Sequence, residues 1–116
     1  MAFLFISEMK KKYRLKKNEE FQAIIQRKNF LSCSAFVLYY INRKEEYSRF
    51  GISVGKKHGK AYLRNKTKRQ IRMMLQELNS TKYDFDGVVI VREDYFQNNY
   101  SENKKNLESL LKKVTM

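Results

Sequence analysis

The chain has 116 residues, of which 42% are apolar, and its formal net charge is +13. The length suits one domain around one core, the apolar content excludes a wholly disordered chain, and the single cysteine, Cys33, excludes an internal disulfide and a cysteine-based zinc site. The charge indicates a polyanionic partner, either nucleic acid or an anionic membrane. No apolar stretch is as long as a membrane span, and the single cysteine suits a reducing compartment, so we expect a cytoplasmic protein.

The N-terminal part of the chain divides into an apolar run and a basic run. We expect residues 1–9 to be a flexible extension and residues 10–116 to form a single domain. Residues 10–17 carry six Lys or Arg in eight positions. Such a run is often only a solvated arm, but this one leads directly into a predicted helix, which favours contact with phosphate groups.

The first predicted elements are a short helix and two strands. Asn18 is a candidate N-cap for a helix that continues to about residue 28. Residues 35–42 are apolar or aromatic at both parities, so this strand is expected to be covered on both faces, or to bind a flat group on its second face. Residues 48–54 form a second strand, and the two are predicted to pair as a hairpin, with a further short strand near residues 30–33.

The second half of the chain predicts a long helix, a central strand and a last helix. A glycine-flanked loop at 55–59 precedes a helix that runs from about 61 to 78. The β-branched run at 87–92 is typical of a buried central strand. Ser101 is a candidate cap for the last helix, whose apolar residues fall at i, i+3, i+4 and i+7. These elements together predict an α+β fold, an α/β sandwich with helices packed on a small sheet.

The positive charge is concentrated in residues 1–76, which sum to +14, while residues 77–116 sum to −1. On the predicted helix at 61–78, four cations and one amide fall within an arc of roughly 140°, separate from the apolar arc: Arg64, Asn65, Lys68, Arg69 and Arg72. A basic helix face is often merely solvated, but residues 48–76 contain no acid that would neutralise this one. We therefore expect a polyanion to supply the counter-charge, and Lys56, Lys57 and Lys60 extend the patch into the preceding loop.

Aromatic residues are more numerous than one core requires, with eight Tyr and eight Phe. Most are expected in the core, but Phe21 and Tyr39 are candidates to face each other across a groove, where rings would stack on unpaired bases. His58 has no carboxylate near it in sequence, and the pair Asp84 and Asp86 is interpreted as a turn before a strand. No catalytic group and no metal site is predicted within the protein itself.

Three motifs lie in the first two thirds of the chain. The segment Arg64-Asn65-Lys66 opens a helix that continues with Lys68-Arg69 and Arg72; upstream, Gly51-Ile52-Ser53-Val54 leads into Lys56-Lys57; and Arg14-Leu15-Lys16-Lys17-Asn18 precedes Phe21. Together with the strand that begins Phe36-Val37-Leu38-Tyr39, these motifs resemble the bacterial ribonuclease P protein family in order and spacing. The resemblance covers about residues 13–78.

The resemblance implies an αβββαβα sandwich with a left-handed βαβ crossover, like one domain of a ribosomal protein of the small subunit. It implies an RNA-binding subunit that helps a catalytic RNA remove the 5′ leader from precursor tRNA endonucleolytically, in a 1:1 ribonucleoprotein whose Mg²⁺ ions are held mainly by the RNA. Contacts to the ribonuclease P RNA would come from Lys56, Lys57, Lys60, Arg64, Asn65, Lys66, Lys68, Arg69 and Arg72. A cleft for the leader would be lined by Arg14, Lys16, Lys17, Phe21, Ile25 and Tyr39. Ile25 stands where relatives often carry a second aromatic residue.

Three other functions fit parts of the pattern. A ribosomal or other structural RNA-binding protein would share the charge but would not need an open aromatic cleft. A protein-only nuclease would need a metal-dependent site of its own. Binding to a membrane surface fits least well, because the basic helix does not set bulky aromatic residues opposite its charges.

Overall fold

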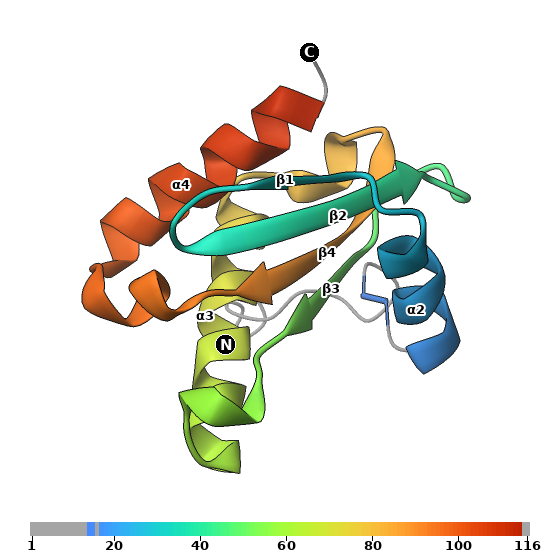
Figure 1. Cartoon of the computed structure of the whole chain (residues 1–116). Coiled ribbons are helices and arrows are strands. Elements are labelled where there is room, and N and C mark those ends of the chain that lie inside the picture. Colours follow the sequence, from blue (N-terminus) through green and yellow to red (C-terminus); the bar gives the residue numbers. More distant parts are fainter. Residues whose placement is uncertain (1–13, 16, 115–116) are drawn as a thin grey trace, which may run out of the picture.

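The structure is a computed structural model that describes residues 14–15 and 17–114 (Figure 1). The expected extension at 1–9 lies outside the described residues. The elements follow the order αβββαβα that the resemblance implied. They are α2 (Asn18–Gln26), β1 (Phe30–Ser32), β2 (Phe36–Asn42), β3 (Phe50–Ser53), α3 (Ala61–Glu77), β4 (Phe85–Val91) and α4 (Tyr100–Val114), with short 3-10 turns η2 (Lys56–His58), η3 (Ser80–Lys82) and η4 (Glu93–Gln97).

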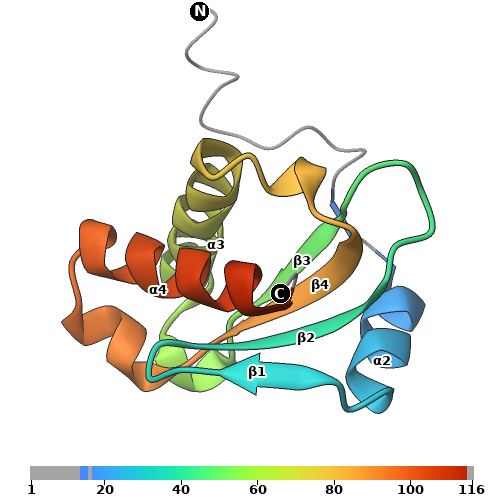
Figure 2. The same ribbon diagram turned by 90° about the horizontal axis from the view of Figure 1, so that it is seen from above.

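The four strands form one sheet in the order β1-β2-β4-β3. The predicted hairpin between β2 and β3 is wrong, because β4 lies between them, antiparallel to β2 and parallel to β3. β4 pairs with a strand at each of its edges and is buried along most of its length, so it takes the central place that its β-branched composition indicated. Seen from the side of α3 with β3 and β4 pointing upward, β4 lies to the left of β3, so this crossover is left-handed (Figures 1 and 2).

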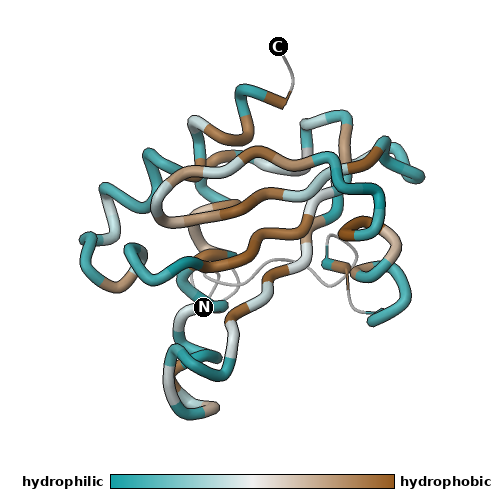
Figure 3. The backbone as a smooth tube through the Cα atoms, in the orientation of Figure 1, coloured by the Kyte–Doolittle hydropathy of each residue, from teal (hydrophilic) through white to brown (hydrophobic). Residues whose placement is uncertain are grey.

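Both faces of the sheet are covered, as the apolar residues at both parities of β2 predicted. α3 and α4 pack on one face, whereas α2 packs on the other face near one end (Figures 1 and 2). Along β2, Phe36 and Leu38 belong to the core beneath α3 and α4, while Tyr39 and Ile41 pack against the smaller cluster beneath α2. The central strands are accordingly the most hydrophobic part of the tube in Figure 3.

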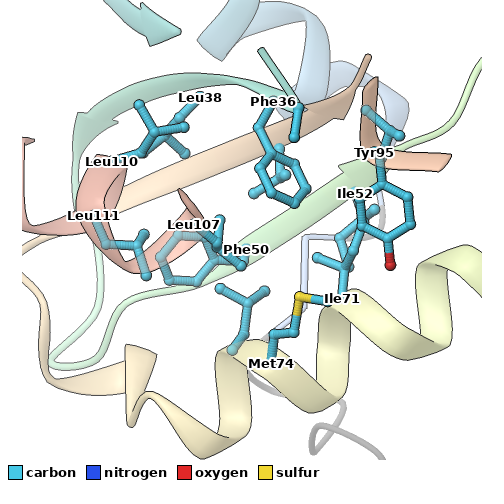
Figure 4. Packing of buried hydrophobic residues seen from close by; sticks show 14 of the residues in the cluster. Phe36, Leu38, Phe50, Ile52, Ile71, Met74, Tyr95, Leu107, Leu110 and Leu111 are labelled. Atoms are coloured by element: carbon cyan, nitrogen blue, oxygen red, sulfur yellow. The ribbon is translucent and has the colours of Figure 1, made fainter. Parts of the chain in front are cut away.

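The main core joins the sheet to the two long helices (Figure 4). α4 contributes Leu107, Leu110 and Leu111, the first three positions of the predicted apolar stripe. α3 contributes Ile71 and Met74, neither of which is exposed to solvent. Burial of each such side chain stabilises the fold by roughly 1.5–3 kcal/mol. These contacts fix the rotation of α3, and therefore which of its side chains face outward.

The starts of α2 and α4 differ from the predicted ones, whereas α3 begins at Ala61 as predicted. α2 already includes Asn18, and the preceding Lys17 makes no capping hydrogen bond through its side chain. α4 is capped by Asn99 and not by Ser101: the backbone N–H of Glu102 donates to Asn99 Oδ1 at 2.9 Å, and the backbone N–H of Asn99 donates to Glu102 Oε1 at 3.0 Å. This reciprocal pair is a capping box. In the described part of the chain, no helix is both long and apolar enough to cross a membrane.

Candidate nucleic-acid interface

The long helix α3 presents three distinct sides. Thr67, Ile71, Met74 and Leu75 are buried against the sheet, as predicted. The first flank carries the predicted cationic group, of which Asn65 and Arg69 are exposed and Arg64, Lys68 and Arg72 are half-buried. Lys66 lies roughly 130° around the helix from the centre of this group, on the opposite flank. The structure therefore divides the predicted RNA-binding residues between two surfaces.

The cations of α3 and its preceding loop have little internal compensation. Lys56, Lys57, Lys60, Lys66, Lys68 and Arg69 make no ion pair with any described residue. The Arg64 guanidinium donates from Nε to the Gly59 carbonyl at 3.2 Å, which leaves its charge without a carboxylate partner among the described residues. Unpaired cations gathered on one helix repel one another, and an RNA backbone would relieve that repulsion.

The loop before α3 holds its lysines in a fixed turn. η2 carries Lys56 and Lys57, and Lys60 stands directly before the helix, all three exposed to solvent. Gly59 adopts φ 128° and ψ −173°, a conformation that a residue with a Cβ rarely adopts. Leu63 packs so closely on this glycine that an added Cβ would lie 3.1 Å from Leu63 Cδ1.

A cleft lies between α2, β3 and α3. Phe21 of α2 lies against the backbone of β3 at Gly51, where an added Cβ would stand 2.3 Å from Phe21 Cζ. One cavity is lined by Phe21 and Gly51 together with Arg14, Lys68 and Arg72. Aromatic surface from α2 thus meets cations from α3, although the two helices cover opposite faces of the sheet. The family motif contains this glycine, and the structure shows that it gives the ring room.

The other predicted cleft residues are placed less centrally. Tyr39 is half-buried beside the cluster under α2, and it lines neither of the cavities that Phe21 lines. Its nearest aromatic neighbour is instead Phe30 of β1, with ring centroids 5.3 Å apart. Ile25 is half-buried and Lys17 is exposed, while Lys16 lies outside the described residues.

Phe30 was not among the residues that the sequence predicted for the cleft. Half of its surface is exposed. The short strand predicted near residues 30–33 contained the signal that would have found it. In that strand, β1, Phe30 is the direct register partner of Tyr39. Cross-strand partners place their side chains on the same face of a sheet, so the two rings form one aromatic surface beside α2.

An ionic network connects α2 to the sheet. Arg49 Nη2 lies 2.8 Å from Glu20 Oε2 and 3.3 Å from Asp86 Oδ2, and the backbone N–H of Arg49 donates to Asp86 Oδ1 at 2.9 Å. Asp86 was predicted to lie in a turn before the strand, but it is part of β4 and is completely buried. Burial opposes the charge of Arg49, but the hydrogen bonds and charges of Glu20 and Asp86 together outweigh it, so the pKa of Arg49 is raised. The network fixes α2, and with it Phe21, relative to β4.

The family model and similar relatives of the chain point to the same protein family. Residues 9–115 match the family described as Ribonuclease P. The chain is 48% identical over 105 residues to the ribonuclease P protein component of Mesoplasma florum, covering 89% of this chain and 96% of the relative. It is also 48% identical over 107 residues to that of Geobacillus kaustophilus, covering 90% and 88%.

Solved structures agree with the sequence relatives. The RNase P protein of Staphylococcus aureus aligns with a TM-score of 0.79 and 38% identity, covering 88% of this chain and 94% of that one. The RNase P protein of Thermotoga maritima aligns with a TM-score of 0.77 and 31% identity, covering 86% and 96%. These relatives do not favour the alternative of a ribosomal protein. The chain therefore belongs to the ribonuclease P protein family, the protein components of the enzyme that processes tRNA.

Proposed function

We propose that this chain binds the ribonuclease P RNA with the cations of α3 and η2, and holds the 5′ leader of precursor tRNA in the cleft beside α2. The observation that carries the proposal is the meeting of Phe21 with Lys68 and Arg72 in one cavity. A ring offers a stacking surface to any base, and the cations attract the phosphates on either side of it. This is the chemistry of a single-stranded RNA channel.

The arginines and lysines of α3 serve the ribonuclease P RNA in this proposal. Guanidinium groups such as that of Arg69 bind phosphate oxygens with two parallel hydrogen bonds, and Asn65 can donate to a 2′-hydroxyl group. Because Arg69 and Asn65 are exposed and lie beside the cleft, one helix would contact the catalytic RNA and border the leader at the same time. We infer a monomer in a 1:1 ribonucleoprotein in the bacterial cytoplasm.

We assign the hydrolytic chemistry to the RNA subunit. Among the described residues there is no group of three or more His, Cys, Asp or Glu side chains arranged to hold a metal ion, and RNA phosphates are the donors that we propose for the Mg²⁺ ions. Mg²⁺ held by RNA phosphates would supply the activation of water and the stabilisation of the leaving oxygen. The protein would contribute by neutralising phosphates and positioning the leader, and the products would be a 5′-phosphorylated mature tRNA and a free leader.

A leader-dependent binding experiment tests this function. The holoenzyme assembled with a bacterial ribonuclease P RNA should bind precursor tRNA more tightly than the same tRNA without its leader. Phe21→Leu should reduce this preference by about 5-fold or more, because it removes a stacking surface. Tyr62→Leu is the matched control, since Tyr62 is 68% exposed on α3 and lines none of the cavities near the cleft. An unchanged preference in Phe21→Leu, or no preference in the parent, would contradict the proposal.

A further inference from the structure

The flank of α3 that faces away from the leader cleft borders a second cavity, which the proposed function does not use. The cavity has a volume of about 280 Å³ and lies between α3, η4 and the start of α4. Lys66 and Gln70 line it from α3, and Tyr95 and Phe96 line it from η4. No residue of this group lines the leader cleft, so the two sites are separate.

Aromatic surface forms one wall of this cavity and is open to solvent. Phe96 is 46% exposed, although η4 anchors it through its neighbour Tyr95, which is buried in the main core. The His58 ring lies against Phe96, with ring centroids 5.0 Å apart and an angle of 34° between the planes. Leu63, which is 40% exposed, completes the apolar wall. A flat group could stack here without any rearrangement of the core.

Polar groups are held at the opposite wall. The Tyr95 hydroxyl donates to Gln70 Oε1 at 2.8 Å, which orients the Gln70 amide nitrogen as a hydrogen-bond donor. Asn103 Nδ2 donates to the Tyr95 carbonyl at 2.9 Å, and Asn98 Nδ2 donates to Asn103 Oδ1 at 3.2 Å. This chain of hydrogen bonds leaves the Asn98 side-chain oxygen as an acceptor. A donor and an acceptor held by buried partners suit the edge of a nucleobase.

The electrostatics of the cavity favour an anionic ligand. Lys66 is the one charged residue among the described residues that line it, and it has no ion-pair partner in the described chain. Exposed Lys57 and Lys60 stand in the loop that carries His58. Among the described residues that line the cavity, a phosphate next to a stacked base would therefore meet lysine and no carboxylate. An apolar peptide would gain nothing from this charge, and a membrane surface would not enter a cavity of this size.

We propose that this cavity binds one unpaired nucleotide of the ribonuclease P RNA, with its base stacked on Phe96 and His58 and its phosphate on Lys66. The inference rests on the proposed function and extends it, because α3 then contacts RNA on both flanks. The leader occupies the flank of Lys68 and Arg72, and the catalytic RNA reaches around the helix to the flank of Lys66. The base is read at its edge by Gln70 and Asn98.

Equilibrium binding to a bacterial ribonuclease P RNA tests this site. Phe96→Leu keeps an apolar side chain but removes the ring, and it should weaken binding by about 5-fold or more without changing the salt dependence. Lys66→Gln should weaken binding and reduce the slope of log K against log salt by about one. Tyr62→Leu removes an exposed aromatic residue of α3 that does not line this cavity, and as the control it should bind as the parent does. Circular dichroism verifies that each variant is folded.

The outcomes separate this inference from the proposed function. If the parent fails to bind ribonuclease P RNA, the proposed function and the inference are both wrong. If the parent binds and both Phe96→Leu and Lys66→Gln bind equally well, only the cavity assignment is overturned. If Phe96→Leu retains its affinity for the RNA but loses preference for precursor over leaderless tRNA, the nucleotide belongs to the substrate, and the assignment to the ribonuclease P RNA is wrong.

Discussion

The ionic network at Arg49 yields a quantitative prediction about stability. In Arg49→Met, the carboxylate of Asp86 would remain fully buried with only the backbone N–H of residue 49 as its partner. Removing one member of a buried ion pair costs about 3 kcal/mol or more, because the remaining charge is left uncompensated. Loss of the more exposed contact to Glu20 adds little, roughly 0.5 kcal/mol, since solvent screens it. We expect a total loss of about 3.5 kcal/mol in the free energy of unfolding at pH 7.

Two further variants identify the buried charge as the cause. Asp86→Asn keeps an acceptor for the backbone N–H of Arg49, and Arg49 retains Glu20, so this variant should lose only about 1 kcal/mol. The double variant Arg49→Met with Asp86→Asn should be more stable than Arg49→Met alone, because no buried carboxylate remains. Arg92→Met is the control, since the Arg92 side chain is exposed and, among the described residues, donates only to the Cys33 carbonyl, at 3.0 Å. It should lie within about 1 kcal/mol of the parent.

Urea denaturation followed by circular dichroism measures these differences. With a slope of about 1.5 kcal/mol per molar, typical of a small domain, Arg49→Met should lower the midpoint by roughly 2 M. Two results would contradict this expectation: a loss of less than about 1 kcal/mol in Arg49→Met, or a double variant that is less stable than Arg49→Met. Either result would mean that Asp86 is not held as a buried, paired carboxylate.

Three other substitutions test separate parts of the structure. Gly51→Ala should lower the free energy of unfolding by about 1–3 kcal/mol and reduce the preference for leader-containing tRNA, because the new methyl group displaces Phe21. Gly55→Ala is its control: the added Cβ would meet nothing closer than 3.9 Å, so urea denaturation should show almost no change in stability. Asn99→Ala should lose about 1 kcal/mol of stability with its capping box, and Ser101→Ala should change it by less than about 0.5 kcal/mol if α4 is capped as described. Burial raises the pKa of Tyr95 to about 12, so the protonated hydroxyl stabilises the folded state fully below pH 10, and this contribution is lost as the pH rises from 10 to 12. When the free energy of unfolding is measured across this interval, Tyr95→Phe should lose less of it than the parent does. An equal loss in the two proteins would contradict the raised pKa.

The local features of this fold were largely predictable from the sequence. The apolar spacing of Leu107, Leu110 and Leu111 gave the inner face of α4, and the β-branched composition of 87–92 indicated the buried central strand. The separation of β2 from β3 by another strand was not predictable in the same way, because two strands near each other in sequence also suit a hairpin. Only the topology shows that β4, some 40 residues later, lies between them.

The candidate site was predictable in composition but not in arrangement. The helical spacing already set Lys66 apart from Lys68, yet it could not show which elements each flank would face, since that depends on how Ile71 and Met74 pack. The contact between Arg49 and Asp86 joins residues far apart in the chain, and no local pattern marks it. The exposure of Phe96 likewise depends on tertiary packing, because it is the burial of Tyr95 in the main core that anchors η4.

The central claim is that the cationic flank of α3 acts on RNA, and cleavage of precursor tRNA at low Mg²⁺ tests it most directly. A bacterial ribonuclease P RNA would be assayed alone, with the parent chain, and with a variant in which Arg64, Arg69 and Arg72 are all changed to Gln. We expect the parent to restore cleavage and the triple variant, verified as folded by circular dichroism, to fail. Stimulation by the folded triple variant equal to that of the parent would contradict the account.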